Sequence, residues 1–536
     1  MILSYEGLKD RSGWEKAGVK LPQFDCETLR AETEKAPVWV HVGAGNIFRA
    51  FIARAQQVLL NEGLAKSGIV AVSTHNYELV KKVYEPFDNM TLLVTLLPDG
   101  STEKEVIASV TKALCVGSEH PQDMASLKAI FRNPSLQILS YTITEKGYAL
   151  QDIHGNLLPS VAAELENGPE NCSHAMCFTA AMLLERYNAG GYPLAVVSMD
   201  NCSHNGEKVR SSVTTVAREW AKRGFVSAEF VAWLEDENNV SFPWSMIDKI
   251  TPRPSAAITS MLEESGIENM GLIPTDSRTN SAPFVNAEKP EYLVIEDRLP
   301  NGRPPLEKAG IYLTDRDTVN NTEKMKVTTC LNPLHTTLAV YGCLLGYNLI
   351  ADEMKDPELK ALVEKIGYVE GLPVVVDPKI LSPKEFIDVV VGQRLPNPFM
   401  PDTPQRIATD TSQKVGIRFG ETIKSYIADP ALDATQLTYV PLAIAGWLRY
   451  LLAVDDKGEA MVCSPDPMLE TLQAQLSGVT LGNPDSVNGK LDAILSNTTL
   501  FGTDLVAAGL STKIETMLKQ MLAGPGAIRQ TLQQYL

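Results

Sequence analysis

The chain has 536 residues, 44% of them hydrophobic and 21% charged, and 65 acidic residues against 48 basic ones give a net charge of −17. This is the composition of a globular protein long enough for two or three domains. The acidic balance argues against a nucleic-acid-binding protein, whose affinity rests on basic residues that meet phosphates. A local basic pocket could still bind a small anion.

The sequence predicts neither a membrane protein nor a secreted one. No apolar run approaches the roughly 20 residues of a membrane helix, and the first 18 residues lack the basic and apolar segments of a signal peptide. The eight cysteines are scattered, so we expect thiols in a reducing cytoplasm rather than disulfides. Cys172, His174 and Cys177 form a loose CxHxxC without the paired spacing of structural zinc sites, and we expect no bound metal.

The sharpest local signal is a glycine turn between an expected strand at 38–42 and a helical pattern at 51–60. A second apolar strand at 68–73 completes a βαβ unit, the opening of a dinucleotide-binding fold. The turn is predicted to hold the cofactor through Gly43, Ala44, Gly45, Asn46, Ile47 and Phe48. Its first glycine permits the tight turn and its second lets the backbone approach a pyrophosphate at the helix N-terminus. The third glycine of GxGxxG is replaced by Phe48, so a purely structural turn is the alternative.

The rest of the chain changes character near residue 300. Further strands are expected at 91–96, 136–140 and 194–198, and their alternation with helices predicts a parallel α/β sheet. A last strand-like run lies at 292–296. From residue 320 onward the patterns are mostly helical. We therefore predict a Rossmann-type dinucleotide-binding domain over residues 1–299 and a mainly α-helical domain over residues 300–536.

The end of the second strand bears on the choice of cofactor. NAD-binding folds usually carry an acid there, which bonds the ribose hydroxyls and repels the extra phosphate of NADP. Here the stretch that starts at Ser73 reads Ser-Thr-His-Asn, without an acid. Ser73 is predicted to lie beside the cofactor, and the choice between NAD and NADP stays open.

Polar clusters follow two other expected strands, where ligands of open α/β sheets bind. One contains Thr144 and Glu145, which are predicted to contact the cofactor, and the other contains Asn201. A plain polar turn is an equally good interpretation of the second cluster. Asp248 lies inside an apolar run, where a carboxylate is unusual unless it is paired or functional.

Two groups in the helical half carry chemistry. Lys326, Asn332 and His335 lie on an apolar stretch, where a desolvated lysine suits a general base and an asparagine amide can hold a developing alkoxide. A solvated helix start with one core histidine is the alternative. Arg406 and Lys414 are eight positions apart, so one helix face could present both to a carboxylate or a multi-hydroxyl ligand. Surface cations on an amphipathic helix are the alternative there.

Seven segments in this order resemble the polyol-specific long-chain (mannitol) dehydrogenase family. They are HVGAGNIFRAF at 41–51, TEKGY at 144–148, MDNCSHNG at 199–206, FPWSMIDKITP at 242–252, VIEDRLPNGRPPLE at 294–307, the Lys/Asn/His helix, and RIATDTSQK at 406–414. The resemblance implies an expanded dinucleotide-binding domain, a helical C-terminal domain, an active site between them, and metal-independent chemistry. It implies NAD as cofactor, with NADP not excluded.

The resemblance also implies roles for the candidate residues. Lys326 would be the general base, Asn201 and Asn332 would cradle the substrate oxygen, and His335 would orient it. Arg406, Lys414 and Asp248 would contact the substrate, and Asp248 is also a candidate for the cofactor.

The resemblance implies an oxidoreductase that interconverts a keto-sugar acid and its secondary alcohol. We favour D-fructuronate reduced to D-mannonate, because an anion suits Arg406 and Lys414. The alternatives are a polyol 2-dehydrogenase acting on mannitol and fructose, a tagaturonate reductase and, from a different class, a non-catalytic NAD(P)-binding redox sensor.

One departure from the family pattern makes a structural prediction. The family usually places four residues between the lysine and the asparagine, whereas five separate Lys326 from Asn332 here. In a regular helix Lys326 would then lie about 180° from His335. We predict a π-bulge or a break between 327 and 333, helped by Pro333, that returns Lys326 toward His335. If the helix were regular, Lys324 would take its place.

Overall fold

The computed structural model describes residues 1–275 and 280–536. The chain divides into two compact units: unit 1 comprises Met1–Leu97 and Ser101–Asn320, and unit 2 comprises Pro98–Gly100 and Asn321–Leu536. The functional boundary at residues 299 and 300 stays a prediction.

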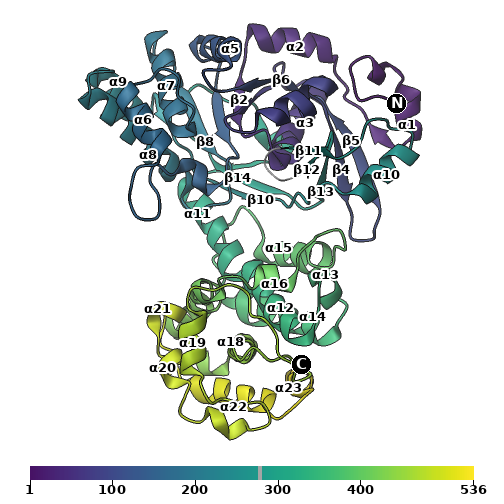
Figure 1. The fold of residues 1–536 in the computed structure, drawn as a ribbon, viewed down its shortest axis with the longest axis vertical. Helices are drawn as coiled ribbons and strands as arrows, with labels where there is room; N and C mark the ends of the chain where they lie inside the picture. The colour runs from purple at the N-terminus through teal and green to yellow at the C-terminus, as the bar shows by residue number, and fades with distance from the viewer. Residues whose placement is uncertain (276–279) are drawn as a thin grey trace. The chain divides into compact units, whose positions relative to one another are not determined.

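Unit 1 is built on a six-stranded parallel sheet, which confirms the predicted fold class (Figure 1). Its strands, in spatial order, are β6 (Val110–Cys115), β3 (Ile69–Ser73), β2 (Trp39–Val42), β7 (Ile138–Tyr141), β8 (Leu194–Ser198) and β9 (Val240–Ser241). The strand order reverses between β2 and β7. In an open α/β sheet this switch point is where ligands bind, outside the carboxyl ends of the strands.

Helices cover both faces of this sheet. They are α2 (Cys26–Lys35), α3 (Ala53–Asn61), α5 (Pro121–Arg132), α6 (Pro159–Asn167), α7 (Ala175–Asn188), α8 (Asn205–Lys222) and α9 (Ala228–Glu235). Val40 and Val42 join the core beneath α5 to α9, whereas Trp39 joins the core beneath α3. Because successive strand residues point to opposite faces, a short apolar run fills both cores.

One strand predicted for the parallel sheet, at 91–96, belongs to another sheet, so that part of the prediction is wrong, whereas the run at 292–296 is a strand as expected. β4 (Thr91–Leu96) pairs antiparallel with β5 (Thr102–Ile107) and parallel with β13 (Phe284–Glu288). β14 (Tyr292–Glu296) lies between β10 (Ser245–Asp248) and β15 (Tyr312–Thr314). An apolar run shows that a strand is buried but not which strand it pairs with.

Unit 1 also contains β1 (Val19–Lys20), β11 (Ile273–Pro274), β12 (Asn280–Ser281), α1 (Arg11–Lys16), α4 (Tyr77–Leu79) and α10 (Ala256–Glu264).

Unit 2 is helical. After α11 (Arg316–Met325), its α-helices are α12 (Asn332–Leu345), α13 (Ile350–Glu353), α14 (Pro357–Glu364), α15 (Pro383–Val389), α16 (Pro404–Ile407), α17 (Glu421–Ala428), α18 (Tyr439–Tyr450), α19 (Leu469–Gln475), α20 (Asp492–Leu495), α21 (Thr498–Phe501), α22 (Ser511–Met521) and α23 (Ala527–Tyr535). Figure 1 shows α18 end-on, with α19 to α23 around it. Every residue of α18 after Tyr439 is buried, as expected for a helix that is apolar on all sides.

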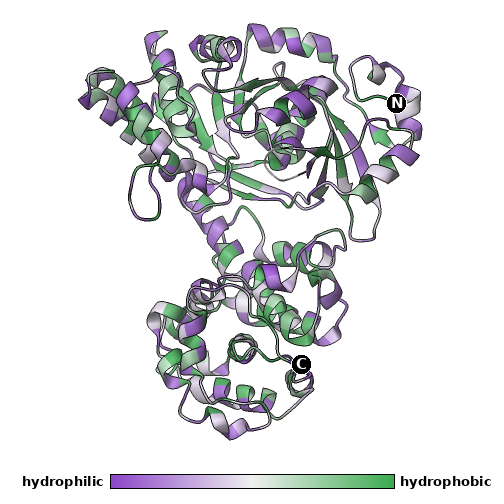
Figure 2. Cartoon of the chain, in the orientation of Figure 1, coloured by the Kyte–Doolittle hydropathy of each residue, from purple (hydrophilic) through white to green (hydrophobic). Residues whose placement is uncertain are grey.

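The distribution of hydropathy follows this architecture. Figure 2 shows hydrophobic residues concentrated on the strands of unit 1 and hydrophilic residues along the outer helix α2. Across the described ranges, no helix combines the length and apolarity needed to cross a membrane. None of the eight cysteines, all within those ranges, forms a disulfide.

Candidate active site

The glycine turn follows β2 at the switch point and fits a dinucleotide. Gly43 has φ +110°, and a Cβ on it would lie 2.2 Å from the carbonyl oxygen of Thr142, so only glycine fits. A Cβ on Gly45 would meet nothing within 4 Å, which leaves its backbone open to a ligand. The helix begins directly after it, since Arg49 N–H donates to the Gly45 carbonyl at 3.1 Å. A helix start beside an open backbone is a suitable cradle for a pyrophosphate.

Phe48, in place of the third glycine, packs against β2. It opens the π-helical turn η2 (Phe48–Ile52), and its ring stacks on that of His41 with centroids 4.2 Å apart. The His41 ring nitrogens contact the hydroxyls of Ser140 and Thr142 at 2.6 and 2.8 Å. Burial lowers the pKa of His41 to about 3, so the ring is neutral. The aromatic stack therefore gives the close helix–strand packing that a third glycine usually permits.

Asp200 joins the loops that follow β7 and β8. Its carboxylate accepts the N–H groups of Ile143 at 2.8 Å and Thr144 at 3.0 Å, and the Tyr148 hydroxyl at 2.5 Å. Thr144 is held at φ +66° and ψ 160°, a strained conformation for a β-branched residue and a mark of functional sites. Burial raises the pKa of Asp200 despite these hydrogen bonds. The sequence prediction included Thr144 but missed Asp200, the acid beside Asn201.

Four other residues of unit 1 were predicted to contact the cofactor or the substrate, and each lies in a different environment. Ser73 ends β3, and its hydroxyl donates to the Asn76 carbonyl at 3.0 Å. Glu145 forms an ion pair with Lys208. Asn201 is exposed in the loop after β8, and Asp248 is the buried last residue of β10.

Asn205 is a second residue that the sequence prediction missed. Its amide nitrogen donates to the carbonyls of Ser198 and Ser245 at 3.3 and 3.0 Å, and its amide oxygen accepts the Ser245 N–H at 3.0 Å. It is fully buried and joins the end of β8 to the start of β10. The only signal in the sequence was its place in MDNCSHNG.

The helix that carries Lys326 is irregular in the predicted place. Lys326–Cys330 form the π-helical turn η7, in which Leu331 N–H donates to the Lys326 carbonyl at 3.1 Å. Leu331 then leaves helical geometry, with φ −132° and ψ −61°, and α12 starts at Asn332. A π turn absorbs one extra residue, as the family spacing requires. Lys326 is 2% exposed whereas Lys324 is exposed, so Lys326 is the desolvated lysine of the pair.

His335, in the first turns of α12, lies against a buried carboxylate. Its Nε2 is 3.4 Å from Oδ2 of Asp402, whose Oδ1 accepts a hydrogen bond from Arg406. Burial by itself raises the pKa of Asp402, but His335 and Arg406 together hold it below its usual value. The structure thus brings together His335 and Arg406, and Asp402 is the third residue that the sequence prediction missed.

Arg406 and Lys414 do not share a helix face, so that prediction is wrong. Helix α16 ends at Ile407, and Asp410 has a left-handed φ of +54°, which interrupts the helix between the two cations. Lys414 Nζ donates to the Thr409 carbonyl, and Arg418 donates to the Thr336 hydroxyl on α12.

Lys414 and Arg418 form a partly buried pair of cations. Burial and the neighbouring Arg418 lower the pKa of Lys414, and burial lowers the pKa of Arg418 to about 10. Two neighbouring cations that are partly removed from water form a suitable receptor for an anion.

Cys172 and His174 of the loose CxHxxC segment make hydrogen bonds to the backbone. Cys172 Sγ donates to the Gly168 carbonyl at 3.7 Å, and His174 Nδ1 accepts the Met176 N–H at the start of α7. A different trio of ligand types, Cys115, His120 and Asp123, gathers at the end of β6. There Asp123 already accepts the Cys115 N–H at 2.8 Å.

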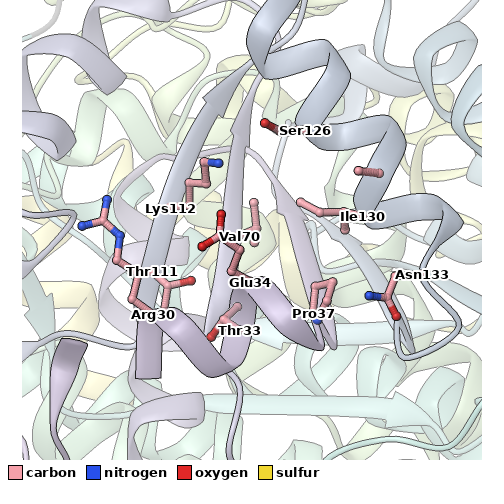
Figure 3. Close-up of a pocket in the computed structure, with 11 residues that line it drawn as sticks. Arg30, Thr33, Glu34, Pro37, Val70, Thr111, Lys112, Ser126, Ile130 and Asn133 are labelled. Carbon is pink, nitrogen blue, oxygen red and sulfur yellow. The ribbon is translucent and has the colours of Figure 1, made fainter. Parts of the chain in front are cut away.

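A cavity of about 480 Å³ lies in unit 1 away from the glycine turn (Figure 3). Arg30 and Glu34 of α2, Lys112 of β6 and Asn133 after α5 contribute to its lining. The strand residues that line it lie in the amino-terminal halves of β3 and β6; Val70, for example, is the second residue of β3. Because ligands of parallel sheets bind at the carboxyl ends, this cavity is not the cofactor site.

Comparison with known proteins defines the class. Residues 37–308 match the mannitol dehydrogenase Rossmann domain, and residues 318–522 match the mannitol dehydrogenase C-terminal domain. The chain therefore belongs to the mannitol dehydrogenase family, and it is an oxidoreductase of that family.

Two individual relatives show which members of the family the chain resembles. The chain is 53% identical to a D-mannonate oxidoreductase of Thermotoga maritima, over 100% of this chain and 99% of that protein. It is 31% identical to a polyol:NADP oxidoreductase of Gluconobacter oxydans, over 82% and 84% of the two chains.

Two solved structures share the whole fold. A substrate-free D-sorbitol dehydrogenase is 27% identical with a TM-score of 0.77, covering 96% of this chain and 98% of its own. The Pseudomonas fluorescens mannitol 2-dehydrogenase, in a ternary complex with NAD and D-mannitol, is 26% identical with a TM-score of 0.67, covering 100% and 99%.

Proposed function

We propose that the protein is an NAD(P)-dependent oxidoreductase that interconverts D-fructuronate and D-mannonate. The observation that carries the proposal is the 53% identity, over its full length, to the D-mannonate oxidoreductase of Thermotoga maritima. A polyol:NADP oxidoreductase and a mannitol 2-dehydrogenase are 31% and 29% identical to the chain, so they support a polyol substrate less well.

We further propose that residues 1–299 hold the cofactor and contribute Asn201 and Asp248 to the substrate site, and that residues 300–536 supply the other substrate groups. The positive φ of Gly43, the open backbone at Gly45 and the adjacent helix start support a pyrophosphate site, with Ala44, Asn46 and Ile47 in the same turn. Ser73, Thr144, Glu145 and Asp248 complete the predicted contacts. The nicotinamide would supply the hydride, as nicotinamide cofactors do.

The proton would move through Lys326. Its burial supports a role as general acid and base, because a buried amine can exchange a proton with the substrate oxygen without competition from bulk water. In reduction its ammonium donates the proton to the carbonyl oxygen of the substrate. In oxidation its neutral amine takes the proton from the hydroxyl. The amides of Asn332 and Asn201 would hold the oxygen while negative charge develops, and His335 would orient it.

The carboxylate of a sugar acid would be held by the cations of unit 2. Arg406, anchored on Asp402, can offer a bidentate fork, and Lys414 lies beside Arg418. Arg406 is already paired with Asp402, so the charge of Lys414 and Arg418 is the part that an uncharged polyol would leave without a counter-charge from the substrate. The cations therefore favour a hexuronate over mannitol, and they do not separate fructuronate from tagaturonate.

The test is oxidation of NADH and of NADPH, followed by absorbance, with D-fructuronate, D-tagaturonate and D-fructose in parallel. We expect the highest kcat/KM with fructuronate. Turnover with fructose alone would move the protein to the polyol branch, and a preference for tagaturonate would change the substrate within the uronates. Cofactor binding without turnover of any of the three would favour the redox-sensor alternative.

A further inference from the structure

We infer that Asp402 is a positioning residue that fixes the tautomer of His335, with Nε2 protonated and Nδ1 left as the acceptor for a substrate hydroxyl. The inference rests on the proposed function and deepens it, since it gives His335 a direction of hydrogen bonding. All three side chains concerned, those of His335, Asp402 and Arg406, belong to unit 2.

The first support is the geometry around the carboxylate. Oδ2 of Asp402 lies 3.4 Å from Nε2 of His335, and Oδ1 accepts from Arg406, so each carboxylate oxygen faces one proposed substrate-contacting residue. Nε2 is buried and makes no hydrogen bond of standard geometry within the described residues. Contacts of catalytic groups are often long without substrate and tighten when it binds.

The second support is that the backbone holds Asp402 in place. The Ile350 N–H at the start of α13 donates to the Asp402 carbonyl at 2.9 Å, and Asp402 is 8% exposed. The next residue, Thr403, caps α16 by accepting the Arg406 N–H at 3.2 Å. Helices α13 and α16 thus hold Asp402 in place, so its carboxylate can hold the side chains of His335 and Arg406.

The chemistry follows from the two ring nitrogens. A neutral imidazole has one donor and one acceptor, and a carboxylate only accepts, so it selects the tautomer with the proton on the nitrogen facing it. With Nε2 committed to Asp402, Nδ1 accepts a hydrogen bond from a substrate hydroxyl next to the reacting carbon. The reacting oxygen carries a single proton, which Lys326 gives in reduction and takes in oxidation, so His335 recognises the neighbouring hydroxyl and thereby places the reacting one.

The test uses the full-length protein and the variant Asp402→Asn, whose amide can donate to Nε2 and so favour the other tautomer. We expect kcat with fructuronate to fall about 10- to 100-fold, with KM changed less than about threefold. Asp402→Glu, which keeps the carboxylate, should recover part of the activity. Asp377→Asn, at an exposed aspartate paired with Lys379, is the matched control and should behave as the wild type.

A second readout does not depend on activity. Nitrogen-15 NMR of histidine-labelled protein reports the tautomer of each of the seven histidines, and the signal lost in His335→Gln assigns His335. We expect Nε2 to be protonated in the wild type and the proton to shift toward Nδ1 in Asp402→Asn. In the His335→Gln background, Asp402→Asn should lower kcat by less than about twofold, because the two residues act together.

The outcomes separate this inference from the proposed function. A raised KM with an unchanged ring tautomer would mean that Asp402 acts through Arg406 alone, which overturns the inference. An unchanged kcat, or an Nδ1-protonated ring in the wild type, would overturn it as well. If the wild type turned over no fructuronate, the proposed function would fail, and the NMR result would still decide the role of Asp402. If Asp402→Asn did not fold, Asp402→Glu would be measured by the same two readouts.

Discussion

Gly43 and Gly45 stand two residues apart in one turn, but the structure constrains them differently. Gly43 is required by the fold, because a Cβ would lie 2.2 Å from a backbone oxygen and φ is +110°. Gly45 has open space where a Cβ would stand. The sequence predicted both glycines for the turn. It could not show that Gly43 alone is required by the fold, because the clash there is with Thr142, about 100 residues away.

This contrast gives a prediction with an internal control. Gly43→Ala should lower the free energy of unfolding by about 2 kcal/mol or more, because it adds a clash to a left-handed conformation. Gly45→Ala should change stability by less than about 0.5 kcal/mol yet weaken NADH binding about tenfold, because its methyl would occupy the space proposed for the pyrophosphate. Urea unfolding and NADH fluorescence titration measure the two effects. Unchanged NADH affinity in Gly45→Ala would remove the proposed cofactor site from this turn.

Lys326 and Lys324 offer a second matched pair. Lys326→Met should lower kcat by about 10²- to 10⁴-fold, because it removes the proposed general acid and base, and should leave NADH affinity unchanged. Lys324→Met, two residues away and exposed, should keep nearly full activity. Steady-state kinetics on both variants show which lysine acts as the general acid and base. The reverse pattern would assign the base to Lys324.

Helices α12 and α13 meet through an unusual contact in unit 2. Glu353, at the end of α13, is fully buried, and neither carboxylate oxygen has a hydrogen-bond partner among the described residues. It lies so close to α12 that a Cβ on Gly342 would be 2.1 Å from its Oε1. Burial, with a smaller contribution from Asp356, raises the pKa of Glu353 well above its ordinary value.

This contact predicts a pH dependence. Since the folded state keeps a proton that the unfolded state loses above the ordinary carboxyl pKa, Glu353 makes the protein less stable as pH rises. Glu353→Met should therefore raise the free energy of unfolding at pH 8 by at least about 1 kcal/mol, with a smaller gain near pH 5.

Urea unfolding at both pH values measures the effect of Glu353→Met. The control is Asp352→Asn, at the adjacent residue, which pairs with Lys355 near the surface. Equal or lower stability of Glu353→Met at pH 8 would show that the carboxylate is stabilised in the folded state.

At the scale of the whole chain, we propose an enzyme that needs no metal, because no step of the proposed chemistry uses one. Dialysis against EDTA should therefore leave at least about 90% of the fructuronate activity, because no proposed step uses a metal. The trio Cys115, His120 and Asp123 is the place to examine if activity falls. Cys115→Ser would then show whether a metal there maintains activity, with Cys172→Ser as the control.

The sequence by itself determined the features that depend on neighbours along the chain. The glycine turn between a strand and a helix identified the dinucleotide-binding fold, since the whole βαβ signal spans a few dozen residues. The extra residue before Asn332 predicted the irregular helix, because the angle per residue and the restrictions of Pro333 are local rules. The ordered motifs identified the family.

Only the tertiary structure decided the features that depend on distant partners. Val110–Cys115, rather than Thr91–Leu96, completes the parallel sheet, because strand pairing is settled by long-range closure and not by the apolar pattern of one strand. Asp200 bonds Ile143 from 57 residues away, and Asp402 meets His335 across a loop and several helices. Asp410, with its left-handed φ, separated two cations that helical spacing had placed together. Such contacts come from chain closure in three dimensions, which no local period encodes.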